Sequence, residues 1–247
     1  MSDFDPGAKT ETVESETIRL RAEIRSLREA LARGDEALVA AEIRLKLAYL
    51  ATIQALVRAI EAKDPYTVGH SAMVAKVVVA IARQLNLSDE EHERLRIAGM
   101  LLDVGKIGVP LEILLKSDEL DAAERAVMEE HVKIGAEIVE PVIYPWDVAN
   151  LIYQHHERLD GSGYPAGLRG DEIEFEARAL GLADAFVAML ADRVWRKARS
   201  EKDILDYFCE QAGKTFDQRC VAALEQLLAG DDELREDLAA FVKSRSR

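Results

Sequence analysis

The sequence contains little of several residue types, and each shortage excludes a class of protein. Only two of its 247 residues are cysteines, Cys209 and Cys220, which is too few for a disulfide framework or a zinc knuckle. The most apolar stretch, residues 74–82, is interrupted by Lys76 and falls short of the roughly 18 residues that a membrane-spanning helix requires. Residues 1–12 are polar and lack the apolar segment of a secretion signal, so we expect a cytoplasmic protein without a membrane partner.

Basic residues are also in short supply, with 32 lysines and arginines against 46 acidic residues and a net charge of -14. Proteins that bind nucleic-acid polymers neutralise phosphates with basic side chains, so the composition argues against a polymer partner. The 49% hydrophobic content excludes a disordered chain. Most of the negative charge lies after residue 63, because the segment before it is nearly neutral.

The N-terminal segment contains a heptad repeat. Two rows of residues alternate at spacings of three and four over about five heptads, which favours a dimeric coiled coil. A long helix that packs against its own domain would give a similar pattern, so that alternative remains open. One row is Val13, Leu20, Leu27, Gly34, Ala41 and Ala48, and the other is Thr17, Ile24, Leu31, Leu38 and Leu45.

The rest of the chain predicts an all-α fold, because alanine, leucine, glutamate and arginine dominate and alternating β-branched patterns are nearly absent. Residues 160–170 hold four glycines and a proline, which indicates an ordered loop. We expect helices over residues 67–85, 88–102, 121–140, 146–158, 174–197, 202–212 and 218–229, with Thr67 as the N-cap of the first. The expected divisions are a disordered tail (1–12), a helical coiled-coil segment (13–50), a multi-helix domain (51–230) and a C-terminal helix or tail (231–247).

Six histidine and aspartate residues stand out because they lie on or next to apolar faces of these helices. A single histidine on such a face is more often a satisfied core residue than a ligand. A buried carboxylate without a partner costs several kcal/mol, however, and buried acids and imidazoles can compensate one another by sharing metal ions. The six residues are His70, Asp103, His131, His155, His156 and Asp184.

Two stretches around these residues carry motifs. They are Asp103–Pro110, which reads DVGKIGVP, and His155–Pro165, which reads HHERLDGSGYP. The first resembles the HD motif region of the HD phosphohydrolase superfamily, and the second resembles the extended motif of its HD-GYP family. Shorter blocks at residues 64–71, 183–186 and 213–217 resemble the same family, so the resemblance covers about two thirds of the chain.

The resemblance implies an all-helical HD-domain bundle that hydrolyses cyclic di-GMP or a related cyclic dinucleotide. It also implies two divalent metal ions, iron or manganese in most members, and a ligand set of nitrogen and oxygen atoms without cysteine suits such ions. The resemblance places the six residues above at the metal-ligand positions, with Asp103 as the ligand that bridges the two ions. It also implies that Asp103 and Lys106 are the catalytic residues. Residues implied to contact the substrate are Lys106, Tyr164, Arg193 and Arg196.

The sequence departs from the family pattern at several positions. Leu102 stands where the HD motif has its histidine, and leucine cannot bind a metal, so one metal site is expected to be weakened or lost. Val187 replaces a usual aspartate that contacts a guanine, and Met73 replaces a common arginine. Tyr66 replaces the glutamate of members with three metals, which predicts no third ion. Val194 and Trp195 replace a usual proline–tyrosine pair.

Three hypotheses remain open at this point. The first is a phosphodiesterase with impaired activity. The second is a catalytically inactive receptor for a cyclic dinucleotide or metal, which signals through the coiled coil of a homodimer. The third is a module that binds a signalling-protein partner and no longer uses its pocket. Retention of all six candidate ligands favours a working site, whereas Leu102 and Val187 argue against full activity.

Overall fold

Helices form the regular secondary structure in the computed structural model, which describes residues 7–64, 67–142, 147–190 and 200–245. The described residues contain two isolated β-bridges and no named strand. The predicted all-α class is therefore confirmed. The chain divides into a first unit, residues 1–52, and a second unit, residues 53–247.

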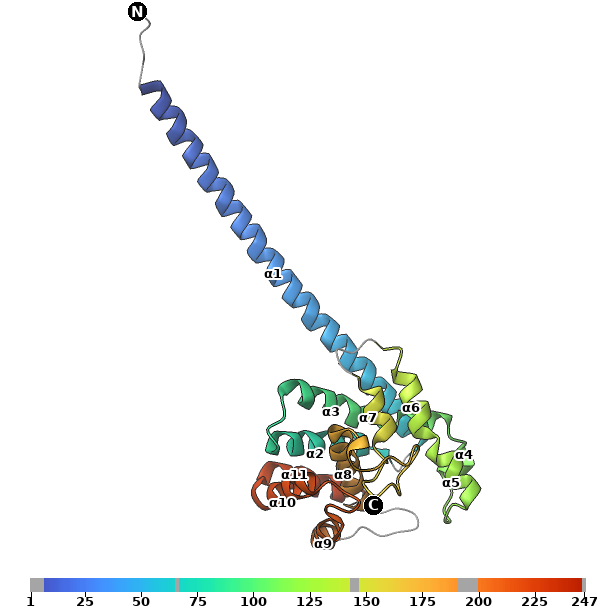
Figure 1. Ribbon diagram of the computed structural model, residues 1–247. Helices are drawn as coiled ribbons and strands as arrows, with labels where there is room; N and C mark the ends of the chain where they lie inside the picture. The colour runs from blue at the N-terminus through green and yellow to red at the C-terminus, as the bar shows by residue number, and fades with distance from the viewer. Residues whose placement is uncertain (1–6, 65–66, 143–146, 191–199, 246–247) are drawn as a thin grey trace, which may run out of the picture. The chain divides into compact units, whose positions relative to one another are not determined.

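The first unit is formed by the greater part of α1 (Gly7–Lys63), a continuous helix of 57 residues (Figure 1). This helix includes residues 7–12, which the sequence predicted to be disordered. Its remaining turns belong to the second unit, where Ile53 and Ile60 are buried. Four side chains of the heptad pattern are between 50% and 73% exposed: Ile24, Leu31, Leu38 and Leu45.

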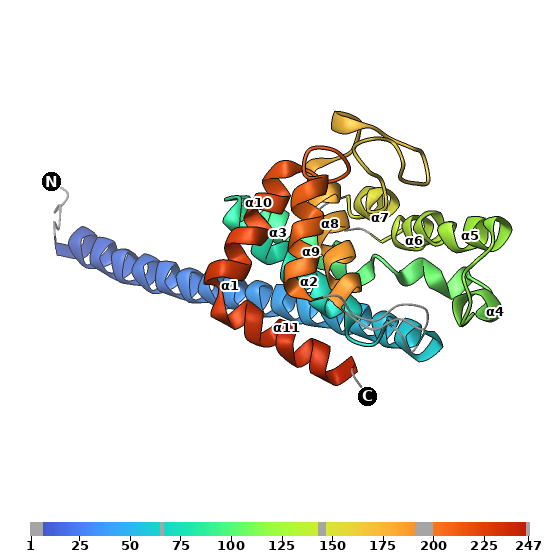
Figure 2. The ribbon, with the colours of Figure 1, turned by 90° about the horizontal axis from the view of Figure 1, so that it is seen from below.

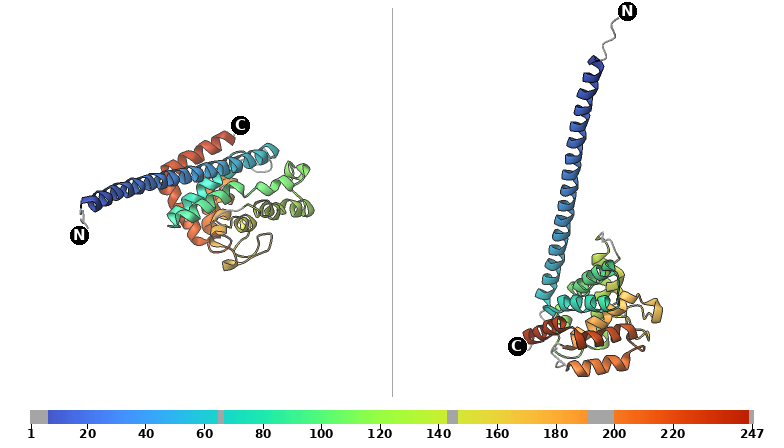
Figure 3. Two further views of the ribbon diagram at one scale, coloured as in Figure 1. Left: turned by 90° about the horizontal axis from the view of Figure 1, so that it is seen from above. Right: turned by 90° about the vertical axis from the view of Figure 1, so that its left-hand side faces the viewer.

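The apolar core of the second unit surrounds α2 (His70–Gln84). This helix packs against α3 (Asp89–Leu101), α8 (Phe175–Leu190), α10 (Gln218–Gly230) and α11 (Asp232–Arg245). The arrangement can be followed in Figures 1 and 2, and Figure 3 gives two further directions. The remaining elements near the core are the 3₁₀ helix η3 (Gly170–Glu172) and α9 (Glu201–Gln211).

A second group of short helices lies at the opposite end of this unit from α10 and α11 (Figures 1 and 2). It consists of α4 (Leu111–Leu114), α5 (Ala122–Glu129) and α6 (His131–Val139). The 3₁₀ helix η2 (Val104–Gly108) and α7 (Ala149–Gln154) both pack against α6. Because α7 also contacts α8, this group joins the core.

Two local predictions about the helices were wrong. The single helix expected over residues 121–140 breaks at Glu130 into α5 and α6. Thr67 does not cap α2: its hydroxyl donates to the carbonyl of Asp64, and the capping residue is Gly69, whose φ of 72° favours glycine. Among the described residues, no helix combines the length and apolarity needed to cross a bilayer.

Candidate metal centre

Three histidines converge where α6 meets α7. His131 is the first residue of α6, His155 follows α7 directly, and His156 is the next residue. Their potential ligand atoms all lie within 4.8 Å of one another. The ring centroid of His131 lies 5.6 Å from that of His155 and 5.2 Å from that of His156. These three residues could hold a metal ion.

Backbone carbonyls orient two of these rings. The Nδ1 atom of His131 donates to the carbonyl of Met128 at 2.8 Å, and that of His155 donates to the carbonyl of Ile152 at 2.6 Å. Each Nε2 atom therefore carries a free lone pair, and both Nε2 atoms are buried without a hydrogen-bond partner. Metal-binding histidines are commonly held in this way through the other ring nitrogen, so the pair fits a metal ion.

Asp103 adds a carboxylate to the cluster. It lies in the turn between α3 and η2, with its Oδ1 atom 3.9 Å from the Nε2 atom of His131. Its Oδ2 atom accepts a hydrogen bond of 2.9 Å from the Nζ atom of Lys106. The carboxylate thus lies between a histidine of the cluster and a lysine ammonium group.

Asp184 adds a second carboxylate from α8. Its Oδ1 atom accepts a hydrogen bond of 2.9 Å from the Nε2 atom of His70, the first residue of α2. Its Oδ2 atom lies 3.9 Å from the Nδ1 atom of His156. The six residues singled out from the sequence therefore lie in one region, although His70 and Asp184 are bonded directly to each other.

The buried environment sets the charges of these groups. Burial lowers the pKa of His155 to about 4, and burial together with neighbouring His155 and His131 lowers the pKa of His156. Burial would raise the pKa of Asp103, but Lys106, His70 and His131 outweigh it and hold that pKa well below its usual range. Burial would also raise the pKa of Asp184, but the hydrogen bond from His70 and the charges of His70 and His155 together outweigh it and lower that pKa. Neutral imidazoles and ionised carboxylates are the protonation states that bind metals.

Two glycines allow the elements of the site to approach closely. A Cβ atom on Gly105, in η2, would lie 1.8 Å from the carbonyl oxygen of His131. A Cβ atom on Gly181, in α8, would lie 2.3 Å from the carbonyl oxygen of His155. Any larger residue would push η2 away from α6, or α8 away from α7, and so separate the two carboxylates from the histidines.

Tyr164 lies beside the cluster, with its ring centroid 4.7 Å from that of His156. Burial raises the pKa of Tyr164 well above its usual value, so its hydroxyl group stays protonated. The ring borders a cavity of about 370 Å³. The cavity is lined by Asp118, Glu119, Leu120, Arg125, Met128, Glu129 and Tyr164.

Glu157 holds the loop that carries Tyr164, a role that the sequence analysis missed. Its buried carboxylate accepts hydrogen bonds from the backbone N–H groups of Ala166, Gly167 and Leu168 at 2.7, 3.1 and 3.0 Å. Its place within the motif at residues 155–165 was a signal that could have found it. The burial of Asp64 was missed as well. Its signal was the spacing of four residues from the apolar Ile60, which also proves to be buried.

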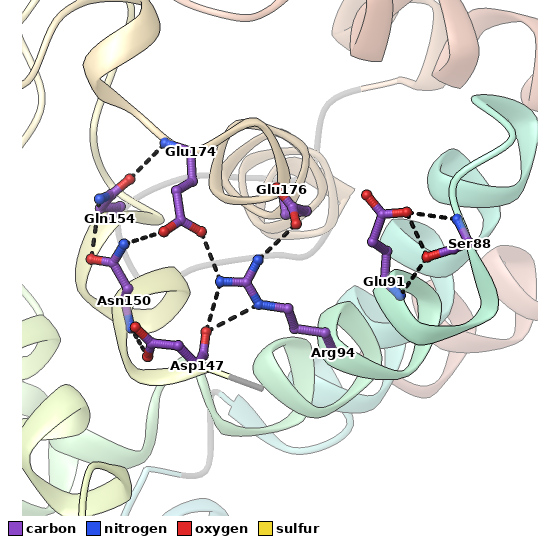
Figure 4. Close-up of polar contacts among 8 residues, drawn as sticks. All are labelled: Ser88, Glu91, Arg94, Asp147, Asn150, Gln154, Glu174 and Glu176. Carbon is purple, nitrogen blue, oxygen red and sulfur yellow. Dashed lines mark hydrogen bonds and ion pairs between the residues drawn. The ribbon is translucent and has the colours of Figure 1, made fainter. Parts of the chain in front are cut away.

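A polar network supports the start of α7 and α8 (Figure 4). Arg94 of α3 donates to the backbone carbonyl of Asp147 and to the carboxylates of Glu174 and Glu176. The backbone N–H of Glu174 donates to the side chain of Gln154 at 2.8 Å. Because Gln154 immediately precedes the paired histidines, this network helps to place them.

The remaining predicted positions lie in the core or outside the described residues. Leu102, Val187 and Met73 are buried within the apolar core. The predicted substrate contacts Arg193 and Arg196 lie outside the described residues, as do Tyr66, Val194 and Trp195.

Comparison with known proteins identifies the family. The sequence profile of the HD domain matches residues 54–220. The chain belongs to the HD-domain family. Within it the chain belongs to the HD-GYP family, whose motif it carries at residues 155–165, and its curated relatives are named as phosphodiesterases of cyclic di-GMP or 3'3'-cGAMP. HD domains depend on metal ions, and the histidine cluster is consistent with that dependence.

Two relatives illustrate the range of this HD-GYP family. The cyclic di-GMP phosphodiesterase response regulator RpfG of Xanthomonas campestris is 35% identical over 94% of this chain and 61% of its own length. The 3'3'-cGAMP-specific phosphodiesterase 3 of Vibrio cholerae is 39% identical over 76% of this chain and 41% of its own length. The chain thus spans less than two thirds of either relative.

Solved structures share the HD-domain fold. A cyclic GMP-AMP-specific phosphodiesterase of Vibrio cholerae aligns over 79% of this chain and 53% of its own, with a TM-score of 0.58 and 20% identity. An HD-GYP-type protein of Bdellovibrio bacteriovorus aligns over 65% of this chain and 52% of its own, with a TM-score of 0.54 and 22% identity.

Proposed function

We propose that this HD domain is a metal-dependent phosphodiesterase of HD-GYP type that hydrolyses cyclic di-GMP or a related cyclic dinucleotide with impaired activity. The observation that carries the proposal is the pair of buried, unpartnered Nε2 atoms on His131 and His155 beside two ionised carboxylates. Burying such polar atoms without a partner costs free energy, which a bound cation would offset. The relatives act on cyclic di-GMP and on 3'3'-cGAMP, so both are candidate substrates.

Two divalent ions, iron or manganese, fit the donor set of imidazole nitrogens and carboxylate oxygens. We assign one position to His131, His155, His156 and Asp103, and the other to His70, Asp184 and Asp103. When bound, such ions activate water as a nucleophile and neutralise phosphate charge. Leu102 is proposed to weaken the second position, because it replaces the histidine of the HD motif with a side chain that cannot bind metal.

The protein's own residues supply the rest of the proposed chemistry. The Lys106 ammonium group, beside Asp103, provides a positive charge for a phosphate oxygen. The protonated hydroxyl of Tyr164 can donate a hydrogen bond to the substrate. We also propose substrate contacts for Arg193 and Arg196.

A second candidate function is a catalytically inactive receptor that binds a cyclic dinucleotide or a metal ion. It is favoured by the direct 2.9 Å hydrogen bond between His70 and Asp184, which satisfies two of the ligands proposed for the weakened position. In either case, we propose that the exposed seam of α1 joins two copies of the chain and that a signalling-protein partner acts through this dimer. We expect the protein to act in the cytoplasm.

Activity of the wild type and of Leu102→His, measured as linear product from each dinucleotide with added Mn²⁺ or Fe²⁺, tests the proposal. We expect slow turnover by the wild type and an increase of about 10- to 100-fold or more on restoring the histidine. Leu102→Asn is the matched control, because asparagine has a similar shape but is a poorer ligand. Circular dichroism verifies that each variant is folded.

Metal content separates the candidate functions further. Protein purified without chelators should contain at least one iron or manganese ion per chain by elemental analysis, and His155→Ala should lower this content. Absence of both metal and product would refute the phosphodiesterase. Bound dinucleotide in calorimetry, without product from either the wild type or Leu102→His, would establish the receptor instead.

A further inference from the structure

The last turn of α1 is attached to both sides of the candidate metal centre. The contacts are made by Glu61 and Lys63 of this turn and by Asp64, the residue that follows the helix. All three belong to the second unit, together with every group that they contact. The contacts therefore lie within one unit. The helix that supplies Glu61 and Lys63 continues without a break into the first unit, which contains the part of α1 before residue 53.

Lys63 binds the end of η2 through main-chain atoms. Its Nζ atom donates to the carbonyl oxygens of Lys106, Ile107 and Val109 at 3.1, 2.7 and 2.6 Å. A lysine ammonium group has three N–H bonds, so these three acceptors use all of them. The last carbonyls of a short helix lack partners within it and favour a cation nearby. Lys63 thus fixes the path of the turn that carries Lys106.

Asp64 acts on the side chain of the same lysine. It is 3% exposed, and its Oδ2 atom lies 3.9 Å from the Nζ atom of Lys106. That Nζ atom donates to Asp103 at 2.9 Å, so the ammonium group lies between two carboxylates. Lys106 is therefore held through its backbone by Lys63 and through its side chain by Asp64 and Asp103.

Glu61 reaches the other side of the centre. Its Oε1 atom accepts a hydrogen bond of 2.6 Å from the backbone N–H of Gly69. Gly69 caps α2, and the next residue is His70, which binds Asp184. One turn of α1 thus contacts the two segments that present His70 and Asp103.

We propose that Lys63 is a positioning residue that keeps Lys106 and Asp103 aligned. Three charge-assisted hydrogen bonds from one ammonium group hold this turn in place. The catalytic part of this inference rests on the proposed phosphodiesterase function. The structural part, restraint of η2 by Lys63, does not depend on it.

The test compares the full-length wild type with Lys63→Met, Lys63→Arg and the control Arg58→Met. Arg58 is an exposed residue of the same helix, so its substitution also removes one positive charge. Hydrogen–deuterium exchange of residues 104–109 is measured alongside kcat and KM with Mn²⁺. We expect Lys63→Met to accelerate exchange in this turn, and to lower kcat, by about tenfold each, with KM within about twofold. Lys63→Arg should recover most of both effects.

Two results would overturn the structural part of the inference, the restraint of η2 by Lys63. One is exchange in residues 104–109 equal to that of Arg58→Met, and the other is equally faster exchange throughout residues 53–245, which would indicate general destabilisation. Faster exchange confined to the turn with unchanged kcat would refute its effect on the centre. If the wild type hydrolyses neither dinucleotide, the phosphodiesterase proposal fails, while the exchange data still decide whether Lys63 restrains η2.

Discussion

Three histidines of the candidate centre, His70, His131 and His155, each have one ring nitrogen hydrogen-bonded and the other without a partner. In His131 and His155, Nδ1 is bound to a backbone carbonyl and Nε2 is free. In His70 the arrangement is reversed, because Nε2 binds Asp184 and the buried Nδ1 atom has no hydrogen-bond partner. His131 and His155 thus present a free Nε2 atom to an ion, whereas His70 would have to give up its hydrogen bond to Asp184 before it could bind an ion through Nε2.

Glu157 offers a test of how the loop beside the histidines is held. Two carboxylate oxygens of Glu157 now accept hydrogen bonds from three backbone N–H groups. Glutamine has only one acceptor oxygen, and its NH₂ group would face a backbone N–H, so that two donors would oppose each other. We expect Glu157→Gln to lower the free energy of unfolding by about 1–3 kcal/mol, measured by urea denaturation.

Glu112→Gln is the matched control for Glu157→Gln, because Glu112 is exposed in α4. Its effect should stay within about 0.5 kcal/mol. Equal stability of the two variants would mean that the three N–H groups find other partners and that Glu157 does not hold the loop.

The residues singled out from the sequence lie close together, but the sequence did not show which of them contact one another. Asp184 was identifiable because it recurs with apolar residues at spacings of three and four, which places it on a buried face. Its bond to His70 crosses 114 residues, and no local pattern encodes such a contact. The lysine contact to η2 was equally hidden, because its three acceptors are backbone carbonyls that any residue type could supply.

The break between α5 and α6 shows how a helix boundary shapes the centre. The backbone N–H groups of Lys133 and Ile134 both donate to the carbonyl of Glu130, so a new helix starts at His131. Val127, which an uninterrupted helix would bury beside His131, is 38% exposed. Because residues 121–140 contain no proline and no glycine before Gly135, their sequence gave no sign of this break.

The part of α1 that lies in the first unit, residues 7–52, allows a prediction at the level of elements. Leu31 and Leu38 are large, exposed and seven residues apart, which matches the seam of a coiled coil. We expect the full chain to be a dimer at micromolar concentration by light scattering. The double variant Leu31→Glu, Leu38→Glu should be monomeric, because it places four carboxylates in the seam of the dimer.

The control for this prediction is Ala32→Glu with Val39→Glu. These exposed residues have the same spacing but lie outside the predicted seam, so this variant should remain dimeric. A monomeric wild type, or dimers from all three proteins, would refute the coiled coil.

The negative charge of the whole protein predicts how the association rate of an anionic ligand depends on ionic strength. Its net charge is -14, and the cavity beside Tyr164 is lined by three acidic residues and one arginine. Raising the ionic strength from about 10 to 150 mM shortens the screening length from about 30 to 8 Å. We therefore expect the association rate of a fluorescent cyclic dinucleotide, measured by stopped flow, to rise about two- to fivefold.

The variant Glu129→Gln serves as an internal comparison for this effect. It removes one negative charge from the cavity, so it should bind faster than the wild type at low ionic strength and at the same rate at high ionic strength. An association rate that falls with salt would show that basic residues dominate the approach of the ligand.

The burial of Leu102 has a consequence for how such a protein could evolve. A fully buried leucine contributes about 2 kcal/mol to the stability of the folded protein. Leu102 therefore stabilises the fold whether or not the enzyme activity is needed. Reversion to histidine would place a polar ring in the apolar core and become tolerable only once an ion occupied the centre. The substitution is therefore hard to reverse. A lineage that exchanged a metal ligand for a core residue would recover full activity only through a less stable intermediate protein.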